Sequence, residues 1–455
     1  MFRIVSDGWS LWDTLLPAEA RQLPAELARV DQVLDHPELL EVFRPEFSAE
    51  RGRRSIPMET FVRLMYLKWS NRWGYDRLVE NVSGSITYKV FCRIPITERV
   101  PDASTLKHLA RRFRPETIER LNRTLIDLAD RAGSVDVSRV RVDSTIVDAN
   151  IAYPTDSGLL TKVVRQLFEA ATVLSARLGL DARVHDFTGE VKDLNRQLGA
   201  RARTRGPDRN AEILALTDEL ADLAGEAGCA AQRVHDQAVV ALADLDRAPR
   251  RTRRALARLT QALDALPALV DQAKARAHQE PVPAAHKRLS IRDCDARPIR
   301  KGSTRRGTQF GCTAQIVEDN AGLIIDYQVC VGQPADAELI TPAIGRITDR
   351  YQTPTIVAAD KTYGTAQSRQ ALTELGVATV AIAHKANQRP PHLTPEQRRT
   401  LTANTRWRAG IEARVSTLKR DHGWDRTRMA NHTGTRTWLG FGVFAHNTRK
   451  LARLL

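Results

Sequence analysis

The spacing of hydrophobic residues predicts a mostly helical region over residues 1–135. Between Met58 and Trp69, apolar side chains recur at near-helical intervals, as expected when one face of a helix is buried. Ser55 and Pro57 precede this run as a cap residue and an opening-turn proline. Short helices with tight turns and many Arg, Lys, Trp and Tyr residues are typical of a helix-turn-helix-like DNA-binding domain. A small helical bundle without DNA contacts explains the same pattern nearly as well.

A period of two replaces the helical period over residues 138–149. Valine and isoleucine alternate there with polar residues, which predicts a half-buried strand with Asp143 on its polar face. Asp148 lies five positions further along and would point to the opposite side of the strand. The two aspartates are therefore not expected to share one metal ion.

Residues 159–285 carry an alanine- and leucine-rich helical pattern. Apolar residues recur there with a four–three spacing, which predicts seams between helices packed as hairpins. The seam residues are Leu160, Val164, Leu167, Ala171, Leu174 and Leu178, then Ile213, Leu216, Leu220 and Leu223, then Leu256, Leu259, Leu263, Leu266 and Val270. Breaks are expected at Gly179, Gly189, Gly206-Pro207, Pro249 and Pro281-Val282-Pro283. No catalytic pattern occurs in this stretch, so we interpret it as a helical insertion.

Strand patterns return after the insertion. Residues 309–317 and 323–331 flank a segment whose Asn and Gly suit a hairpin turn. A predicted helix over 336–350 then leads to 355–360, a short apolar run that ends at Asp360. An acid at the carboxyl end of a buried strand lies where open α/β sheets place their chemistry.

The remaining segments complete an alternating pattern. We expect a helix over 366–375, a strand over 378–382, a polar loop over 388–395, a helix that carries Glu412, and a last helix over 437–455 packed against the sheet. Without residues 159–285 the predicted order is β-β-β-α-β-α-β-α, the plan of a ribonuclease-H-like α/β domain. The predicted domains are an N-terminal all-helical domain at 1–135, a ribonuclease-H-like catalytic domain at 136–158 plus 286–455, and the long helical insertion at 159–285.

The balance of charges points to an anionic partner. The 455 residues include 69 Lys and Arg against 54 Asp and Glu, a formal net charge of +15. This favours nucleic acid over a membrane as partner, with a merely soluble basic protein as the alternative. Five widely spaced cysteines without a CxxC pair argue against a zinc ribbon and a disulfide framework. No apolar run approaches the ~18–20 residues of a spanning helix, and residues 1–7 lack a signal-peptide core, so we expect a cytoplasmic, nucleoid-associated protein.

One late helix combines a carboxylate with two cations. Arg408, Glu412 and Lys419 follow one another at offsets of four and seven, so a helix stacks them on one narrow stripe. Such a stripe suits a site where a metal ion meets a phosphodiester backbone. Solvated salt bridges on a surface helix are the favoured explanation when the segment is taken alone. Asp143 and Asp360 have similar ordinary explanations, as a strand-edge acid and a helix cap.

Several sequence blocks together resemble one known family. They are Phe43-Arg44-Pro45, Trp73-Gly74-Tyr75, Leu78-Val79-Glu80 and Val100-Pro101-Asp102-Ala103-Ser104-Thr105 in the N-terminal region, Val142-Asp143-Ser144-Thr145 with Asn150-Ile151-Ala152-Tyr153-Pro154-Thr155-Asp156, Ala359-Asp360-Lys361-Thr362-Tyr363-Gly364, and Arg408, Glu412 and Lys419 followed by His422-Gly423-Trp424-Asp425-Arg426-Thr427-Arg428. From about residue 40 to the C-terminus, the chain resembles DDE transposases of bacterial insertion sequences, specifically the group with a Tyr-Arg-Glu-Lys signature around its third acid. Thr405 replaces the tyrosine of that signature, and Thr362 stands where glycine is common. The missing tyrosine weakens any inference of a hairpin route of strand cleavage.

The resemblance implies a catalytic site and its partners. Asp143, Asp360 and Glu412 would be the catalytic, metal-binding acids of a transposase that cleaves element ends and transfers strands into target DNA. Three carboxylates without Cys or His ligands favour two Mg²⁺ ions, or Mn²⁺ as a substitute. Arg408 and Lys419 would hold phosphates, and Lys361 and Arg420 are further expected DNA contacts.

The implied partners are double-stranded DNA, as terminal inverted repeats and as target, and a second copy of the chain in a homodimer. Two alternatives remain open: a metal-dependent nuclease of the same fold that does not join strands, and a non-enzymatic DNA-binding remnant of a transposase. A nucleotide-binding enzyme is disfavoured, because the chain contains neither GxxxxGK[ST] nor GxGxxG.

Overall fold

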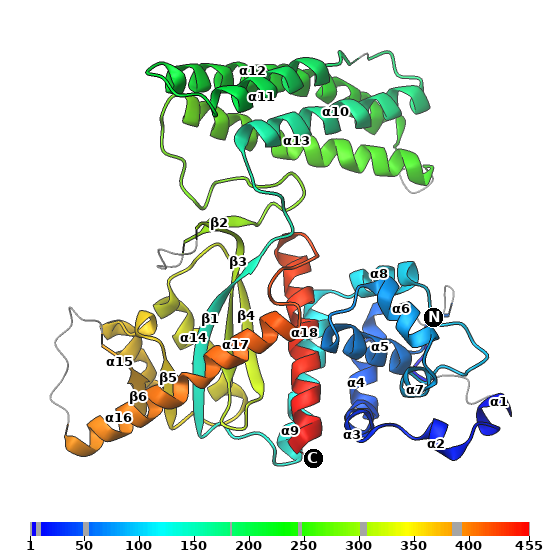
Figure 1. Ribbon diagram of the computed structural model, residues 1–455, viewed down its shortest axis with the longest axis vertical. Coiled ribbons are helices and arrows are strands. Elements are labelled where there is room, and N and C mark those ends of the chain that lie inside the picture. The colour runs from blue at the N-terminus through cyan, green and yellow to red at the C-terminus, as the bar shows by residue number, and fades with distance from the viewer. Residues whose placement is uncertain are drawn as a thin grey trace. The chain divides into compact units, whose positions relative to one another are not determined.

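The chain folds into two compact units. The computed structural model describes residues 2–5, 11–48, 54–182, 184–243, 248–300, 307–384 and 394–454. One unit contains residues 1–148 and 313–455, and the other contains residues 149–312 (Figure 1). These limits differ from the predicted boundaries 1–135, 136–158 plus 286–455 and 159–285, and the functional division into three domains stays a prediction.

The N-terminal part of the first unit is helical, as the hydrophobic spacing predicts. Its helices are α1 Leu11–Thr14, α2 Ala18–Arg21, α3 Ala25–Leu34, α4 Pro37–Glu41, η1 Arg44–Glu46, α5 Met58–Ser70, α6 Tyr75–Ser83, α7 Ile86–Phe91, α8 Ala103–Arg112 and α9 Pro115–Arg131. Every residue of α5 is buried, so this helix is surrounded on all sides by its neighbours. Asp102 begins α8 by accepting hydrogen bonds from the backbone N–H groups of Ser104 and Thr105.

A mixed sheet forms the rest of this unit. Its strands are β1 Arg139–Asp148, β3 Gln309–Glu318, β4 Ile324–Val331, β5 Ile356–Ala359 and β6 Thr379–Ile382, and the short β2 Arg297–Ile299 pairs with the start of β3. The strand order is β2-β3-β1-β5-β6, with β4 also paired to β3. β1, β5 and β6 run parallel, whereas β3 and β4 are antiparallel. The helices of this part are α14 Asp336–Arg350, α15 Ala366–Glu374, α16 Pro395–Arg408, α17 Gly410–Asp421 and α18 Asn431–Leu454.

The observed order of elements agrees with the predicted one. Leaving aside the helices of the second unit and the short β2, the chain runs β1-β3-β4-α14-β5-α15-β6-α16. The 3-10 turn η3, Lys361–Tyr363, follows β5 directly. Most of the polar loop that we expected over 388–395 lies outside the described residues.

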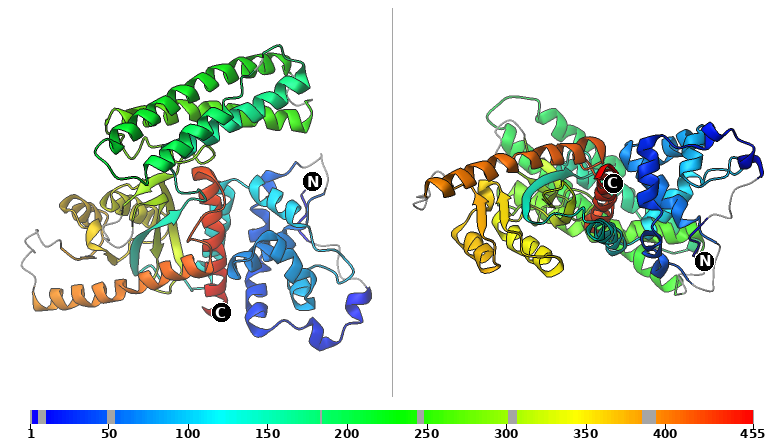
Figure 2. Two further views of the ribbon diagram at one scale, coloured as in Figure 1. Left: turned by 45° about the horizontal axis from the view of Figure 1, so that its top comes forward. Right: turned by 90° about the horizontal axis from the view of Figure 1, so that it is seen from below.

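The last helix has more packing partners than predicted. As expected, α18 contacts the sheet through β4, and it also contacts α9, α5 and α3. Its apolar residues cover more than one face, and Phe441 stacks on Trp69 of α5 at a ring distance of 4.8 Å. Figure 2 shows α18 between the N-terminal helices and the sheet. The helix therefore joins both parts into one unit.

Close packing around α18 predicts that replacing Gly442 by alanine destabilises the protein, although alanine normally favours a helix. A Cβ atom at Gly442 would lie 2.6 Å from the carbonyl oxygen of His422 and 2.8 Å from Nε1 of Trp424. Because both neighbours are buried, Gly442→Ala is expected to lower the free energy of unfolding by about 1–3 kcal/mol. Gly345→Ala in α14 is the control, since a Cβ there meets nothing within 4 Å, and it is expected to add up to about 1 kcal/mol. Urea unfolding followed by circular dichroism measures both, and equal shifts of the same sign would contradict this packing.

The second unit is a bundle of long helices, coloured green in Figure 1. They are α10 Asp156–Leu178, α11 Thr188–Arg201, α12 Arg209–Ala241 and α13 Arg250–Ala277. Gly179 ends α10 in the left-handed conformation, as predicted. Gly189, which we expected to break a helix, lies inside α11. The helical part thus begins slightly before residue 159 and ends before residue 285.

The seam of α12 also differs from the predicted one. Leu220 is buried, but Ile213, Leu216 and Leu223 are only partly buried. Alanines fill most of the buried stripe of this helix: Ala221, Ala224, Ala227, Ala231 and Ala238. A Cβ atom at Gly228 would lie 2.2 Å from Cδ2 of Leu266 in α13, so these two helices approach very closely. The small residues, rather than the leucines, therefore mark the contact face of α12.

Candidate functional site

The sheet register brings two of the predicted acids to neighbouring positions. In the parallel pairing of β1 with β5, Val142 lies opposite Ala359. The next residues along the two strands are Asp143 and Asp360, both partly buried. Neighbouring strands are ~4.8 Å apart, and residues in register point to the same face of a sheet. The carboxyl end of β5 therefore carries two adjacent carboxylates from segments more than two hundred residues apart.

A hydrogen bond orients the side chain of Asp143, and a phenol is buried nearby. Oδ1 of Asp143 accepts a hydrogen bond of 2.8 Å from the N–H of Ser144, and the Ser144 hydroxyl donates to Asp336 at 2.6 Å. Tyr363, in η3 just after Asp360, is fully buried, as expected of a residue packed beneath the second acid. Burial raises the pKa of Tyr363, and the carboxylates of Asp336 and Asp143 raise it further. The phenol therefore stays neutral and serves as packing.

The third predicted acid lies on α17, and its side chain is paired within the helix. Nη2 of Arg408, the last residue of α16, donates to Oε1 of Glu412 at 3.0 Å. A turn at Ala409 separates α16 from α17, yet the predicted i,i+4 stacking of these two residues is present. The Glu412 side chain is 65% exposed, so water or a substrate can reach it.

The junction of α16 and α17 docks on the polar face of β1. Arg139, Arg141 and Asp143 share this face because they alternate along the strand. The guanidinium groups of Arg139 and Arg141 lie 4.5 and 4.8 Å from the centre of the Trp407 ring. Arg141 also donates through Nη1 to the Trp407 carbonyl oxygen at 2.8 Å. These contacts attach the helices that carry Arg408 and Glu412 to the same face that carries Asp143.

A buried carboxylate, which sequence reasoning missed, fixes this docking. Glu318, at the end of β3, is fully buried and accepts hydrogen bonds of 2.8 Å from Nε of Arg141 and from Nε of Arg414. Arg414 lies on α17, so one carboxylate ties that helix to β1 and β3. We had assigned Glu318 to the hairpin turn. The available signal was an acid that directly follows the apolar run Ile316–Val317.

The remaining predicted residues lie around this site at different levels of exposure. Lys361 and Arg420 are exposed, and Arg420 pairs with Asp421 at 3.0 Å. Lys419 is partly buried on α17. Asp148 lies at the far end of β1, where its N–H donates to the carbonyl oxygen of Asp425. Within the described ranges, no group of three or more His, Cys, Asp or Glu residues lies close enough to hold a metal ion. The strand register gives Asp143 and Asp360 neighbouring positions, whereas Glu412 is paired with Arg408.

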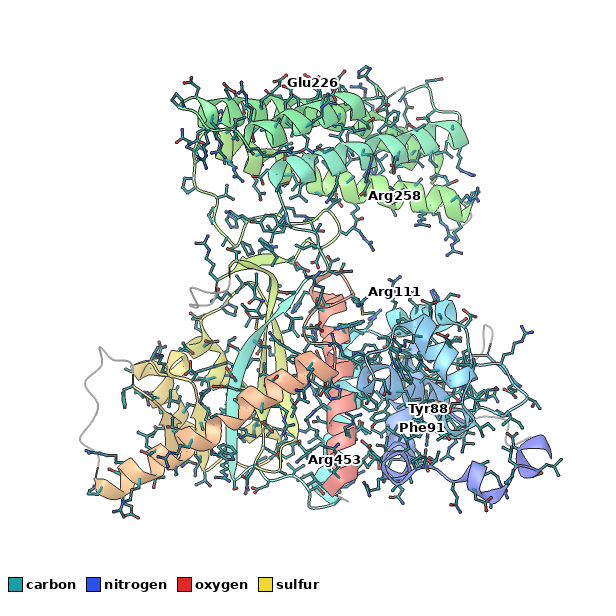
Figure 3. All side chains as sticks on the ribbon, viewed as in Figure 1. Tyr88, Phe91, Arg111, Glu226, Arg258 and Arg453 are labelled. Carbon is teal, nitrogen blue, oxygen red and sulfur yellow. The ribbon has the colours of Figure 1, made fainter. Side chains whose placement is uncertain are left out.

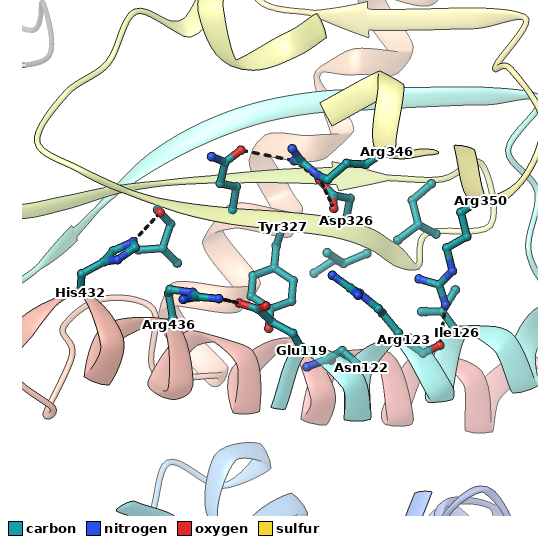
Figure 4. Close-up of a pocket in the computed structure, with 14 residues that line it drawn as sticks. Glu119, Asn122, Arg123, Ile126, Asp326, Tyr327, Arg346, Arg350, His432 and Arg436 are labelled. Atoms are coloured by element: carbon teal, nitrogen blue, oxygen red, sulfur yellow. Dashed lines mark hydrogen bonds and ion pairs between the residues drawn. The ribbon is translucent and has the colours of Figure 1, made fainter. Parts of the chain in front are cut away.

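A second polar region of the unit has a structural role. A cavity of about 320 Å³ lies between α9, α14, α18 and β4, and Figure 4 shows its lining. Its charged groups pair with one another: Arg346 with Asp326 at 2.6 Å and Arg436 with Glu119 at 2.6 Å. Nε2 of His432 donates a hydrogen bond of 2.8 Å to the Val329 carbonyl oxygen, because a carbonyl can only accept. These contacts join β4 to α14 and to α18, and α18 to α9.

Two models of known protein families match parts of the chain. A family model described as "Transposase domain (DUF772)" matches residues 15–112, and one described as "Transposase DDE domain" matches residues 286–448. The second range includes Asp360 and Glu412, whereas Asp143 lies between the two matched ranges. No solved structure matches the chain.

One curated relative is similar to part of the chain. It is "Uncharacterized protein ORF8 in nfe locus" from Rhizobium meliloti, which is 29% identical over 125 residues, covering 26% of this chain and 60% of the relative. Among the described residues, no helix combines the length and the apolar character needed to cross a membrane.

Proposed function

The chain belongs to the DDE transposases of insertion sequences, and from this premise we propose that it cleaves the ends of such an element and joins them to target DNA. The observation that carries the proposal is the register of β1 and β5, which gives Asp143 and Asp360 neighbouring positions. The helices with Arg408 and Glu412 dock on the same face of β1. The two neighbouring carboxylates and the docking of these helices on β1 support a site for phosphodiester chemistry.

The residues present fit a hard divalent cation. Mg²⁺ binds oxygen ligands and commonly uses one or two protein carboxylates together with substrate phosphates and water. Asp143 and Asp360 supply such a pair, and Glu412 would supply the third carboxylate from α17. When bound, divalent ions of this kind activate an attacking oxygen and stabilise a leaving one. The proposed site residues are therefore Asp143, Asp360 and Glu412.

The protein's own groups would orient the DNA at this site. In end cleavage, a water oxygen forms a bond to phosphorus and the strand leaves as a free 3′-hydroxyl. In strand transfer, that hydroxyl attacks a target phosphodiester and displaces the target's 3′-oxygen. Arg408 and Lys419, one turn before and two turns after Glu412, would hold the phosphates in line through charge-assisted hydrogen bonds.

Strand transfer in Mg²⁺ tests the proposal. The assay combines labelled element-end DNA, a target plasmid, and either the wild type or Glu412→Gln. Joined product from the wild type that is absent with Glu412→Gln is the expected result. Cleavage without joining would instead identify a nuclease of the same fold, and DNA binding without cleavage in Mg²⁺ or Mn²⁺ would identify a DNA-binding remnant.

The predicted phosphate contact of Lys419 gives a separate result. Lys419→Gln is expected to weaken binding of element-end DNA and to reduce the slope of log K against log[salt] by about 0.9, because one fewer counterion is released. Arg120→Gln, an exposed change on α9, is the matched control and should keep the slope. Fluorescence anisotropy at several salt concentrations measures both, and an unchanged slope for Lys419→Gln would remove this residue from the DNA contacts.

We also propose that the active form is a homodimer, because two element ends must be joined in one event. The helical bundle of residues 156–277 is the proposed dimer contact, since its long helices offer an extended surface. Light scattering of the chain with end DNA should give the mass of two protomers, and a monomer mass would contradict the proposal.

A further inference from the structure

A second concave site lies in the first unit, and Asp143, Asp360 and Glu412 are not among its lining residues. Its cavity of about 390 Å³ is formed by α5, by α6, by α8 and by residues 423–429, with Trp438 of α18. We call it the aromatic pocket. Its volume falls within the ~300–1,000 Å³ of small-molecule sites. Residues 423–428 belong to a sequence block that carries the family resemblance and that the proposed chemistry does not use.

A buried lysine forms the inner end of the aromatic pocket. Lys68 is 4% exposed, and its Nζ lies 3.5 Å from the Trp69 ring centre, 4.8 Å from that of Tyr75 and 4.6 Å from that of Trp438. Within the part of the chain that the structure describes, no carboxylate pairs with this ammonium group. A buried charge without a counterion is strongly unfavourable, although aromatic faces offset part of the cost. The lysine therefore favours an anion that enters the pocket.

Burial has a second effect on Lys68. Desolvation, together with the positive charge of Arg428, lowers its pKa to about 7. An anion bound beside Nζ would raise the pKa again, because a nearby negative charge stabilises the ammonium form. The ammonium form of Lys68 is therefore more stable with an anion bound in the pocket than without one.

The rim of the pocket is strongly cationic. Six Lys or Arg residues, including Lys68, line the pocket as a whole, compared with two Asp residues. One of these cations, Arg72, is already paired with Asp425 at 2.7 Å. Arg111 at the end of α8, labelled in Figure 3, is exposed, and so is Arg428. Such an excess of guanidinium groups selects for phosphate, which they bind through paired hydrogen bonds.

The walls add a preference for a flat aromatic group. Trp73 and Tyr75 line the pocket and are only partly buried. Side chains of this kind stack on nucleobases regardless of sequence. We propose that the aromatic pocket binds a single nucleotide, with its phosphate at Lys68 and Arg428 and its base against the aromatic wall. The backbone of an intact duplex cannot reach Lys68, so the nucleotide is either free or an unpaired nucleotide of a DNA strand.

Ligand binding to the full-length protein tests this inference. Quenching of tryptophan fluorescence by dAMP, by deoxyadenosine and by inorganic phosphate gives three dissociation constants. dAMP is expected to bind at least about tenfold more tightly than either fragment, because only dAMP engages both the cations and the stacking wall. Arg428→Gln and Lys68→Met should remove this advantage, whereas Arg120→Gln should keep it. Since Arg428 is exposed, its variant tests the pocket even where Lys68→Met fails to fold.

Two duplexes identify the source of the nucleotide. One is blunt, and the other carries a single unpaired 5′-phosphorylated nucleotide. If the first experiment shows that dAMP binds, tighter binding of the duplex with the overhang assigns the pocket to DNA. Equal binding of both duplexes then assigns it to a free nucleotide. Phosphate that binds as tightly as dAMP, or an Arg428→Gln variant with unchanged dAMP binding, would overturn the inference. Because dAMP binding is measured without DNA, its outcome does not depend on whether the protein cleaves and joins DNA.

Discussion

Replacement of Asp360 by asparagine is expected to lower the rate of end cleavage by about 10³-fold while binding of end DNA stays unchanged. The carboxylate lies beside Asp143 through the β1–β5 register, and the amide keeps its shape but loses the negative charge that a divalent cation needs. Loss of about 4 kcal/mol of charge stabilisation in the transition state corresponds to this factor. Asp143→Asn should behave in the same way, because the two carboxylates form one site.

Single-turnover cleavage of labelled end DNA, with anisotropy for binding, measures this effect. Asp148→Asn is the matched control on the same strand, since Asp148 lies five residues from Asp143 at the far end of β1. Its cleavage rate should stay within a few-fold of the wild type. Equal losses for Asp148→Asn and Asp360→Asn would show that the register does not define the catalytic position.

Replacement of Glu318 by glutamine is expected to cost about 3–5 kcal/mol of folding free energy, because it leaves two cations beside a neutral group in the core. Arg141 and Arg414 both donate to this carboxylate, and the side-chain exposures are 0% for Glu318, 12% for Arg141 and 20% for Arg414. Since this cluster attaches α17 to the sheet, the position of Glu412 depends on it.

Urea unfolding of the wild type, Glu318→Gln and Glu80→Gln measures the cost. Glu80 is an exposed glutamate on α6, and its substitution should change stability by less than about 0.5 kcal/mol. A Glu318→Gln protein as stable as the control would mean that the two arginines do not need this carboxylate.

The positions of the acids on their elements could be predicted from the sequence. The alternation around Asp143 and the apolar run before Asp360 identify a strand in each case, and both strands are present. Their neighbouring register could not be predicted, because pairing between distant strands depends on the packing of the whole sheet and not on local periodicity.

Buried charge was the main feature that local patterns did not reveal. Glu318 is separated from its partners by 177 and 96 residues, so no local spacing connects them. The spacing between Met58 and Trp69 predicts one buried helix face, whereas every residue of α5, Lys68 included, is buried. In α12, the spacing of the leucines does not predict the buried alanine stripe, since close helix contacts need small residues rather than large ones. The packing of α18 against both the N-terminal helices and β4 depends on tertiary contacts in the same way.

The central claim is that Asp143 and Asp360 form a divalent-cation site, and titration with Mn²⁺ followed by electron paramagnetic resonance tests it most directly. The wild type with end DNA should bind Mn²⁺, and the Asp143→Asn, Asp360→Asn double variant should lose that binding while Asp148→Asn keeps it. Mn²⁺ binding that is unchanged in the double variant would contradict the account.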